Sequence, residues 1–457
     1  MSDILNQSAD DTSEAIAAGT LDPVDLMQTT LDRIAATNGQ ANAIVSLQNA
    51  DDLLAQAAAA RDAPRKGWLH GIPLAVKDLA NVAGIPTSMG SPALAGTVPK
   101  TSDLIVQRMM DAGAIIIGKT NTPEFGLGSH TYNPVFGATQ NALLPCKSAG
   151  GSSGGAAVAL AHNMVCVADG SDMMGSLRNP AGWNGIYGMR PTWGRVPPSS
   201  DGDLFHHHLS TSGPMARTPT DLAQLLEIQS GADPRHPYGW PVETYHDKLD
   251  VSLKGRRIGW LGDWGGAYPM EDGAQSTCEA AVTAFADLGC EVVSLAPPFS
   301  RDAMWEAWIT LRAWAVAASL GPLYDTAKTR DQLKPEAIWE VETGRALSAA
   351  QIARASSLRS DWYRAAAKMF QEVDVVALPT AQCWPFPIEW DWPKQIAGVQ
   401  MDTYHRWMEV VVPCSLIGLP GVAVPIPDTA MGLQLIGKTG DDLGVLQCAQ
   451  GWHRRNA

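Results

Sequence analysis

Short apolar runs alternate along the chain with longer stretches in which apolar residues recur every three or four positions. Apolar runs of about four to eight residues are typical of buried strands, and the longer periodic stretches are typical of helices. The runs predict strands over residues 41–47, 72–76, 114–117, 165–168, 257–261, 291–295, 373–378 and 421–424. The periodic stretches predict helices over residues 23–36, 53–61, 103–112, 156–161 and 276–288. Strands that alternate with helices in this way indicate an α/β fold.

Two predicted strands end next to residues that can carry chemistry. The strand over 72–76 leads directly into Lys77, and the strand over 165–168 is followed by a segment that begins at Gly170 and contains Ser176. Open α/β sheets place their ligands beyond the carboxyl ends of their strands. The segment after Gly170 is therefore a candidate site.

Charge narrows the range of partners. The chain has 457 residues and a formal net charge of −14, whereas a phosphate-binding surface needs clustered lysine and arginine. The same charge disfavours docking on anionic membranes. We therefore expect neither a nucleic acid nor a membrane as partner, and we expect a monomer or a homodimer.

The first residues and the cysteines indicate a cytoplasmic protein. Residues 1–20 are polar and acidic, so they do not resemble a signal peptide, and no apolar stretch approaches the roughly 18 residues of a membrane span. The seven cysteines are scattered and never form a C-x-x-C pair, which predicts reduced thiols and neither disulfides nor a zinc site. We expect no metal and no organic cofactor, because no cluster of histidine and cysteine has ligand spacing.

Tryptophan is unusually common. Nine of the 16 tryptophans fall between Trp305 and Trp407, and Trp305 and Trp308 share one helix face if that segment is helical. Two interpretations stay open at this point. These rings pack the core, or some of them line a pocket for an apolar or aromatic substrate.

Two short motifs match well-known expressions without the structural context those motifs need. Residues 113–120 fit the phosphate-binding pattern G-x-x-x-x-G-K-[ST], but the stretch that would cradle phosphate contains three consecutive isoleucines and reads as a strand. Residues 150–154 fit the G-x-S-x-G nucleophile elbow, with Ser152 at its centre, but no apolar strand precedes them. His206, His207 and His208 look like a surface cluster and not like the histidine of a triad. Nucleotide binding and an α/β-hydrolase esterase that uses Ser152 are therefore remote alternatives.

A longer set of motifs is far more specific. Residues 150–155 contain four glycines and two serines, and glycine permits close backbone approaches that other residues resist. Together with residues 170–181 and 185–192, this block resembles the amidase signature. Supporting blocks follow in family order at residues 71–78, 118–125, 213–217 and 432–437, so the resemblance covers essentially the whole chain.

The resemblance implies a fold and a set of site residues. The fold would be an α/β/α sandwich with a large mixed central β-sheet flanked by helices, formed as one domain over residues 1–457. Its catalytic core would span about 65–220, and the tryptophan-rich, partly helical region of about 300–410 would lie on the substrate side. The family uses a Ser–cis-Ser–Lys triad, which by motif position is Ser176 as nucleophile, Ser152 as the bridging residue and Lys77 as base.

The resemblance also implies the groups around the triad. The oxyanion hole would consist of backbone N–H groups, and these belong to Met173, Met174, Gly175 and Ser176. Ser153, Asp172 and Arg178 would support the nucleophile loop, the last two through charge-assisted bonds. The chain departs from the family pattern Asp-x-Gly-Gly-Ser at one position, because Met174 replaces the first glycine.

Physical chemistry supports these roles. A serine hydroxyl is too weakly acidic to attack an amide unaided, and a neutral lysine amine can accept its proton if burial lowers the lysine pKa. Lys77 follows an apolar strand, which suits a buried amine. The hypothesis is an amidohydrolase that cleaves C–N bonds of small-molecule aryl or alkyl amides and of carbamates such as urethanes, with side esterase activity, through an acyl-enzyme. The alternatives are the glutamine-hydrolysing subunit of a tRNA-dependent amidotransferase and a binding protein on an inactive amidase fold.

Overall fold

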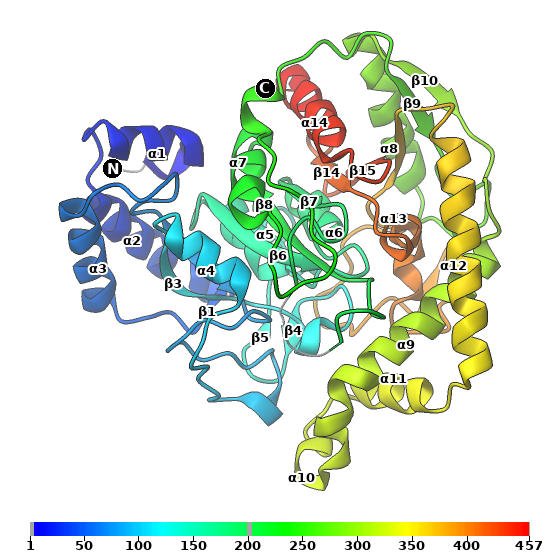
Figure 1. The fold of residues 1–457 in the computed structure, drawn as a ribbon, viewed down its shortest axis with the longest axis horizontal. Coiled ribbons are helices and arrows are strands. Elements are labelled where there is room, and N and C mark those ends of the chain that lie inside the picture. Colours follow the sequence, from blue (N-terminus) through cyan, green and yellow to red (C-terminus); the bar gives the residue numbers. More distant parts are fainter. Residues whose placement is uncertain (1–3, 199–202, 457) are drawn as a thin grey trace.

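The computed structural model describes residues 4–198 and 203–456 and has an α/β architecture, with a large mixed sheet flanked by helices (Figure 1). Eight strands form this sheet in the order β10-β9-β11-β15-β14-β7-β8-β6. Their bounds are β6 Val167–Asp172, β7 Tyr187–Arg190, β8 Thr211–Ala216, β9 Arg257–Trp260, β10 Glu291–Ser294, β11 Val375–Pro379, β14 Gly421–Pro425 and β15 Gly432–Gly437. Strands β10, β9 and β11 are parallel, and every other neighbouring pair is antiparallel.

A second, three-stranded sheet adjoins the edge strand β6. It has the order β1-β3-β2, formed by β1 Ile44–Val45, β2 Pro73–Lys77 and β3 Ile115–Thr120. The backbone N–H of Lys77 donates to Asp169 Oδ1 at 2.9 Å, which ties the end of β2 to β6. Two further strand pairs are short: β4 Tyr132–Asn133 with β5 Gly137–Ala138, and β12 Gln395–Ile396 with β13 Val399–Gln400.

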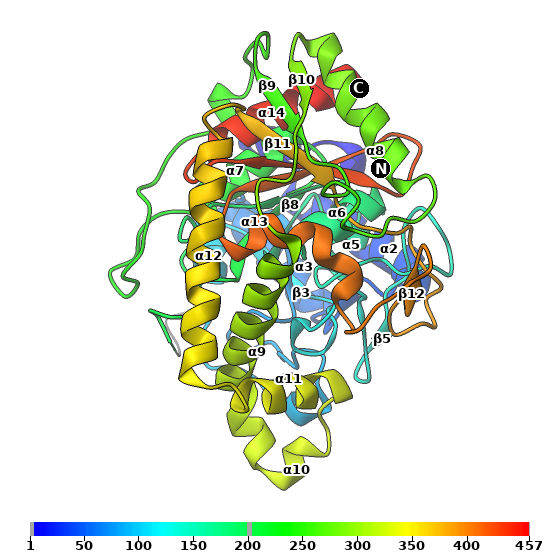
Figure 2. The same ribbon diagram turned by 90° about the vertical axis from the view of Figure 1, so that its right-hand side faces the viewer.

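Helices cover these sheets and extend away from them in one region. The helices associated with the sheets are α1 Ala9–Ala17, α2 Pro23–Ala41, α3 Ala50–Asp62, α4 Leu104–Asp111, α5 Gly154–Ala161, α6 Arg178–Asn184, α7 Pro219–Gln229, α8 Ala274–Thr283, α13 Val412–Leu416 and α14 Asp442–Asn456. The remaining helices form a separate group: α9 Arg301–Asp325, α10 Ala327–Arg330, α11 Pro335–Arg345 and α12 Ala349–Met369. Both views show α9 and α12 side by side (Figures 1 and 2). Short 3₁₀ turns occur at Ile4–Asn6, Pro92–Leu94, Glu124–Gly126, His246–Lys248, Ala284–Leu288 and Arg406–Val411.

Several predicted boundaries were wrong. The predicted strand over 41–47 shrinks to β1, because α2 continues to Ala41 and ends at Asn42 in the left-handed conformation. The predicted strand over 165–168 begins later and runs to Asp172, because β6 pairs with β8 along its whole length despite its polar end. The predicted helix over 276–288 is α-helical only to Thr283 and continues as a 3₁₀ turn.

The tryptophan-rich region is a mixture of core and surface. Trp308, Trp362 and Trp407 are almost fully buried, whereas Trp339 and Trp390 are exposed. The core interpretation therefore holds for the buried rings. Within the described residues, the structure contains no helix whose length and hydropathy would let it cross a bilayer.

The histidine cluster differs from its prediction in two members. His206 is exposed as expected, but His207 and His208 are half-buried. The ring of His207 packs edge-on against Trp314, and that of His208 stacks on Trp193 with 4.0 Å between centroids. The ring is covered because the segment from 205 to 208 lies against α12, where Arg359 donates to the carbonyl of His208.

Candidate active site

Lys77 is the last residue of β2, and its side chain is buried among hydroxyl groups. Its Nζ lies 2.7 Å from Ser152 Oγ, 2.9 Å from Ser153 Oγ and 3.0 Å from Ser171 Oγ. In the described part of the chain, no carboxylate lies within ion-pair distance of this amine. Burial therefore dominates and lowers the pKa of Lys77 to about 7, although the more distant Asp169 and Asp172 raise it in part.

The Gly-rich segment brings Ser152 and Ser153 to that amine. The peptide bond between Gly151 and Ser152 is cis, as the resemblance implies. Ser153 precedes α5, and its hydroxyl donates to the carbonyl of Ser171 at 3.3 Å. This segment turns from a loop into α5, so it is not the strand-to-helix elbow of an α/β-hydrolase. Gly155 allows α5 to pack closely, because a Cβ there would lie 2.3 Å from the backbone nitrogen of Asn121.

Ser176 lies in the loop directly after β6 and is buried, with 5% of its surface exposed. The backbone N–H of Ser153 donates to the carbonyl of Ser176 at 3.3 Å, which joins the two Ser-containing segments. The hydroxyl of Ser176 has no hydrogen-bond partner among residues 4–198 and 203–456.

Asp172 braces the loop that carries Ser176. Its carboxylate accepts from the backbone N–H of Gly175 at 2.8 Å, from Arg178 Nε at 3.0 Å and from Arg190 Nη1 at 3.2 Å. Burial alone would raise the pKa of Asp172, but the two guanidinium groups hold it well below its usual range. The carboxylate therefore stays ionised and fixes the loop, as predicted for Asp172 and Arg178.

The predicted oxyanion donors are not equivalent. The N–H groups of Met173, Met174 and Ser176 have no acceptor in the described structure, so they are free to bind an oxyanion. The N–H of Gly175 is already occupied by Asp172. Gly175 has another role, because it adopts φ +79° and a Cβ there would lie 2.8 Å from the side chain of Val411. The N–H of Gly175 is therefore not available to an oxyanion as predicted, because it is bound to Asp172. The residue instead allows the turn of the loop, which needs its positive φ.

Three contributors to this site were missed in the sequence. Asp169 and Ser171 alternate along β6 and both face Lys77, and Arg190 on β7 is a second cation on Asp172. The period-2 spacing of Asp169 and Ser171 was a usable signal, because residues two apart share one face of a strand. No comparable signal pointed to Arg190, which reaches the site through sheet pairing.

A buried polar cluster meets the nucleophile loop from the helical region. Arg312 on α9 donates to Glu340 Oε1 at 2.8 Å and to the hydroxyl of Tyr404 at 2.7 Å. A third donor, Nη1, lies 3.1 Å from the sulfur of Met173. Because a thioether is a weak acceptor, this N–H is the least satisfied donor of the guanidinium.

The stretch that fits a phosphate-binding loop is a buried strand, as the sequence indicated. Residues 115–120 form β3, and Lys119 lies 3.6 Å from Asp78 Oδ1 in the interior. Lys119 thus differs from Lys77, because it has a carboxylate partner and contributes to the core.

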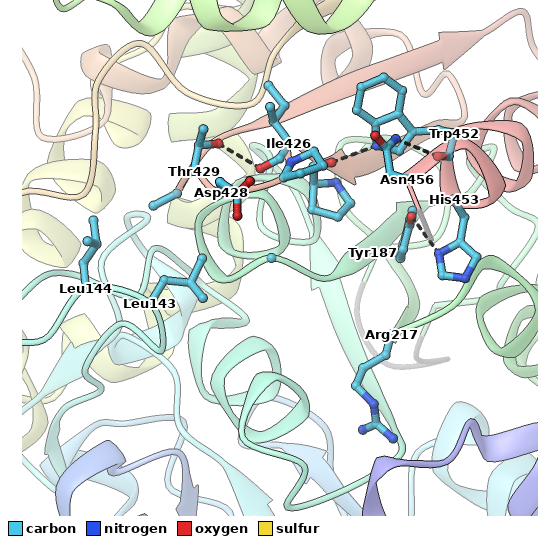
Figure 3. Close-up of a pocket in the computed structure, with 14 residues that line it drawn as sticks. Leu143, Leu144, Tyr187, Arg217, Ile426, Asp428, Thr429, Trp452, His453 and Asn456 are labelled. Carbon is cyan, nitrogen blue, oxygen red and sulfur yellow. Dashed lines mark hydrogen bonds between the residues drawn. The ribbon is translucent and has the colours of Figure 1, made fainter. Parts of the chain in front are cut away.

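Figure 3 shows a cavity of about 520 Å³ that Tyr187, Arg217 and His453 help to line. The strand register places it at the opposite end of β6, β7 and β8 from Asp172. Its lining includes Tyr187 and Arg217, which stand at the far ends of β7 and β8. Tyr187 and His453 are hydrogen-bonded there at 3.1 Å. None of the predicted catalytic residues lines this cavity.

Known proteins resemble this chain over nearly its whole length. Residues 25–446 match the family model described as Amidase. A glutamyl-tRNA(Gln) amidotransferase subunit from Chloroflexus aurantiacus is 34% identical over 96% of this chain and 94% of its own. Acylamidase from Rhodococcus erythropolis is 30% identical over 97% of this chain and 94% of its own.

Among solved structures, a bacterial aryl acylamidase of the amidase signature family superposes with a TM-score of 0.91. It is 28% identical and covers 98% of this chain and 96% of its own. The shared fold, the matched family model and relatives of at least 30% identity agree with one another. This chain belongs to the amidase signature family and is an amidohydrolase that acts on C–N bonds.

Proposed function

We propose that this protein hydrolyses apolar amides and carbamates through Ser176, Ser152 and Lys77. The observation that carries the proposal is the environment of Lys77, a buried amine that contacts three hydroxyls and no carboxylate. With its pKa lowered to about 7, a large fraction of Lys77 is neutral near pH 7 and can accept a proton.

In this mechanism the proton moves from Ser176 to Ser152 while the proton of Ser152 moves to the Lys77 amine. Ser176 Oγ bonds to the carbonyl carbon and forms a tetrahedral oxyanion, which the N–H groups of Met173, Met174 and Ser176 stabilise. The C–N bond then breaks, and the leaving amine receives a proton from Lys77 through Ser152. Water hydrolyses the acyl-enzyme by the same proton route. A carbamate reacts likewise: C–N cleavage releases the amine, and water hydrolyses the alkoxycarbonyl-enzyme to a carbonic monoester, which loses carbon dioxide to give the alcohol.

The surroundings of the nucleophile support an apolar substrate. Met173 and Met174 flank the oxyanion donors, and Val411 lies against Gly175. Methionine adapts to varied apolar groups. The nearby cation, Arg312, is already neutralised by Glu340, so it offers no uncompensated charge to a zwitterion such as glutamine. The likeness to an aryl acylamidase and an acylamidase points the same way.

A substrate panel tests this proposal. We expect kcat/KM for an apolar anilide and for an aryl carbamate to exceed the value for acetamide by at least about tenfold, because each buried apolar group contributes about 1 kcal/mol or more. If acetamide were preferred by that margin, the proposed apolar pocket would be contradicted. Loss of all activity in Ser176→Ala, with an unchanged melting temperature, would link turnover to the proposed nucleophile.

A second candidate function is glutamine hydrolysis within a multi-subunit amidotransferase. The 34% identity to a glutamyl-tRNA(Gln) amidotransferase subunit favours it. The two functions differ in what the isolated chain does. An acylamidase turns over anilides alone and ignores glutamine, whereas the amidotransferase function requires glutamine turnover that increases when partner subunits bind.

A further inference from the structure

A groove separate from the cavity of Figure 3 lies between α9 and α12. It has a volume of about 510 Å³, and its apolar lining includes Leu311, Trp314 and Ile352. The segment from Phe205 to His208 closes one side. Leu311 and Trp314 share a face of α9 because they are three residues apart.

Arg359 is the charged residue of this groove. Its Nη2 donates to the carbonyl of His208 at 3.0 Å. The other N–H groups of its guanidinium have no acceptor among the residues that the structure describes, and no carboxylate of that set forms an ion pair with it. Burial, and then the nearby Arg190, lower the pKa of Arg359 to about 10, which leaves the group charged at pH 7.

A second unpartnered polar group lies beside this cation. His208 Nε2 is buried and makes no hydrogen bond within the described chain. Burial lowers the pKa of His208, with Arg359 as the next cause, so the ring is neutral at pH 7. A partly buried guanidinium with spare donors is costly in isolation and is satisfied by an anion.

Residues next to the groove lining contact the loop of Ser176 or the groups that hold it. Arg312 follows Leu311 on α9, and its guanidinium contacts Met173. Leu209 follows His208, and its carbonyl accepts from Arg190, which binds Asp172. Arg190 is also close enough to Arg359 to lower its pKa, which connects the charged residue of the groove to the loop through one side chain.

We propose that the groove between α9 and α12 is a substrate subsite for a carboxylate carried on an apolar or aromatic body, with Arg359 as its anchor. This rests on the proposed amide hydrolysis and narrows its substrate class to amides that carry an anionic group beyond the scissile bond. The guanidinium fork binds the carboxylate, and Trp314, Leu311 and Ile352 contact the apolar body. Because the net charge of −14 disfavours anions elsewhere, an anionic substrate depends on the local positive charge of Arg359.

Matched anilides test the subsite. Acetanilide serves as neutral reference, 4-acetamidobenzoate carries the carboxylate on the amine side, and glutaranilate carries it on the acyl side. We expect at least one carboxylate substrate to exceed acetanilide in kcat/KM by about tenfold, and Arg359→Met to abolish that preference while acetanilide turnover changes less than about threefold. The substrate that responds identifies the side of the scissile bond that occupies the groove.

Two controls keep the outcome clear. Arg354→Met removes an exposed arginine from the same helix, paired with Glu306, and should leave the preference intact. Arg359→Lys keeps the charge and a donor for the His208 carbonyl, so it should fold normally and retain part of the preference.

Calorimetric titration of both carboxylate anilides into Ser176→Ala separates this inference from the proposed function, because it needs no turnover. If the carboxylate anilides bind in an Arg359-dependent manner but the native protein cleaves no amide, the subsite is supported and the proposed hydrolysis is contradicted. Equal behaviour of neutral and carboxylate substrates in the native protein, or a preference that survives Arg359→Met, would overturn the subsite.

Discussion

Buried polar groups have different partners in two regions of the molecule. One region is the edge where β2 meets β6, and the other is the helical region from α9 to α12. At the sheet edge, Lys77 is surrounded by hydroxyls and Asp172 by donors that hold it from several directions. In the helical region, Arg312 and Glu340 form a neutral pair inside an aromatic and aliphatic environment, whereas Arg359 has spare donors. In the proposed function, the first region would carry the reaction, and the second would contact the substrate.

The comparison suggests a division of roles, in which the sheet edge would determine the reaction and the helical region would determine the choice of substrate. In the proposed mechanism, the chemistry depends on short contacts among Lys77, Ser152 and the loop of Ser176. The helical region contacts that loop through Arg312 and Met173. The predictions that follow separate the two regions by the kinetic parameter that each affects.

The largest effect should come from Ser176→Ala. Removal of the nucleophile should lower kcat by about 10⁴-fold or more, because no other hydroxyl can form the acyl-enzyme. Ser152→Ala should approach that loss, whereas Ser153→Ala should cost less. Steady-state kinetics with an anilide, supported by melting curves, measure all three. If Ser152→Ala alone were inactive and Ser176→Ala kept activity, Ser152 would be the nucleophile.

Next in size is the loss of the base in Lys77→Met. Native kcat/KM should rise with pH through about 7, because Lys77 is catalytically competent only above its lowered pKa, when it is neutral. The variant should lose about 10³-fold in activity and also lose this inflection. A pH–rate profile from pH 5 to 9 gives both results. An inflection that persists in Lys77→Met would assign the titration to another group.

Replacement of Asp172 should affect stability as well as rate. Asp172→Asn leaves Arg178 and Arg190 buried without their carboxylate, which should cost about 3–5 kcal/mol of unfolding free energy. The folded-state pKa of Asp172 lies below its unfolded value of about 3.9, so its stabilisation is present above pH 4 and fades as pH falls further. Denaturant unfolding at pH 7 and at about pH 2 should show the variant's deficit shrinking at the lower pH, because the stabilisation is lost only below the unfolded pKa. An equal deficit at both pH values would contradict the ionic role.

The sequence predicted the sheet edge better than the helical region, for physical reasons. Lys77 was identified as the base through the resemblance of residues 71–78 to a family motif, whereas the apolar residues before it predicted only that it ends a strand. Ser171 was missed because its role depends on which strand faces β6, and single-sequence patterns carry no pairing information. The helices from α9 to α12 were seen only through the spacing of Trp305 and Trp308, since their apolar residues face several neighbours and leave no simple period.

Arg312→Met should weaken the link between the two regions. The variant leaves Glu340 without its cation and releases Met173, so we expect KM for an apolar anilide to rise about tenfold with a smaller change in kcat. The double variant Arg312→Met with Glu340→Gln removes the stranded charge and should recover stability without recovering KM. Recovery of both would show that Arg312 matters only for folding.

The smallest effect should come from Met174→Ala, which tests whether the residue that departs from the family pattern lines the substrate pocket. Its backbone N–H survives the change, so acetamide turnover should stay within about threefold of the native value. A bulky anilide should lose about tenfold in kcat/KM, because it forfeits contact with the thioether side chain. Met174 is 5% exposed and packs in the core, so some loss of melting temperature should accompany the change. The ratio of the two substrates is therefore the decisive quantity, since a stability defect lowers both activities together. An unchanged ratio would place Met174 in the core alone and leave Met173 and Val411 to shape the acyl side.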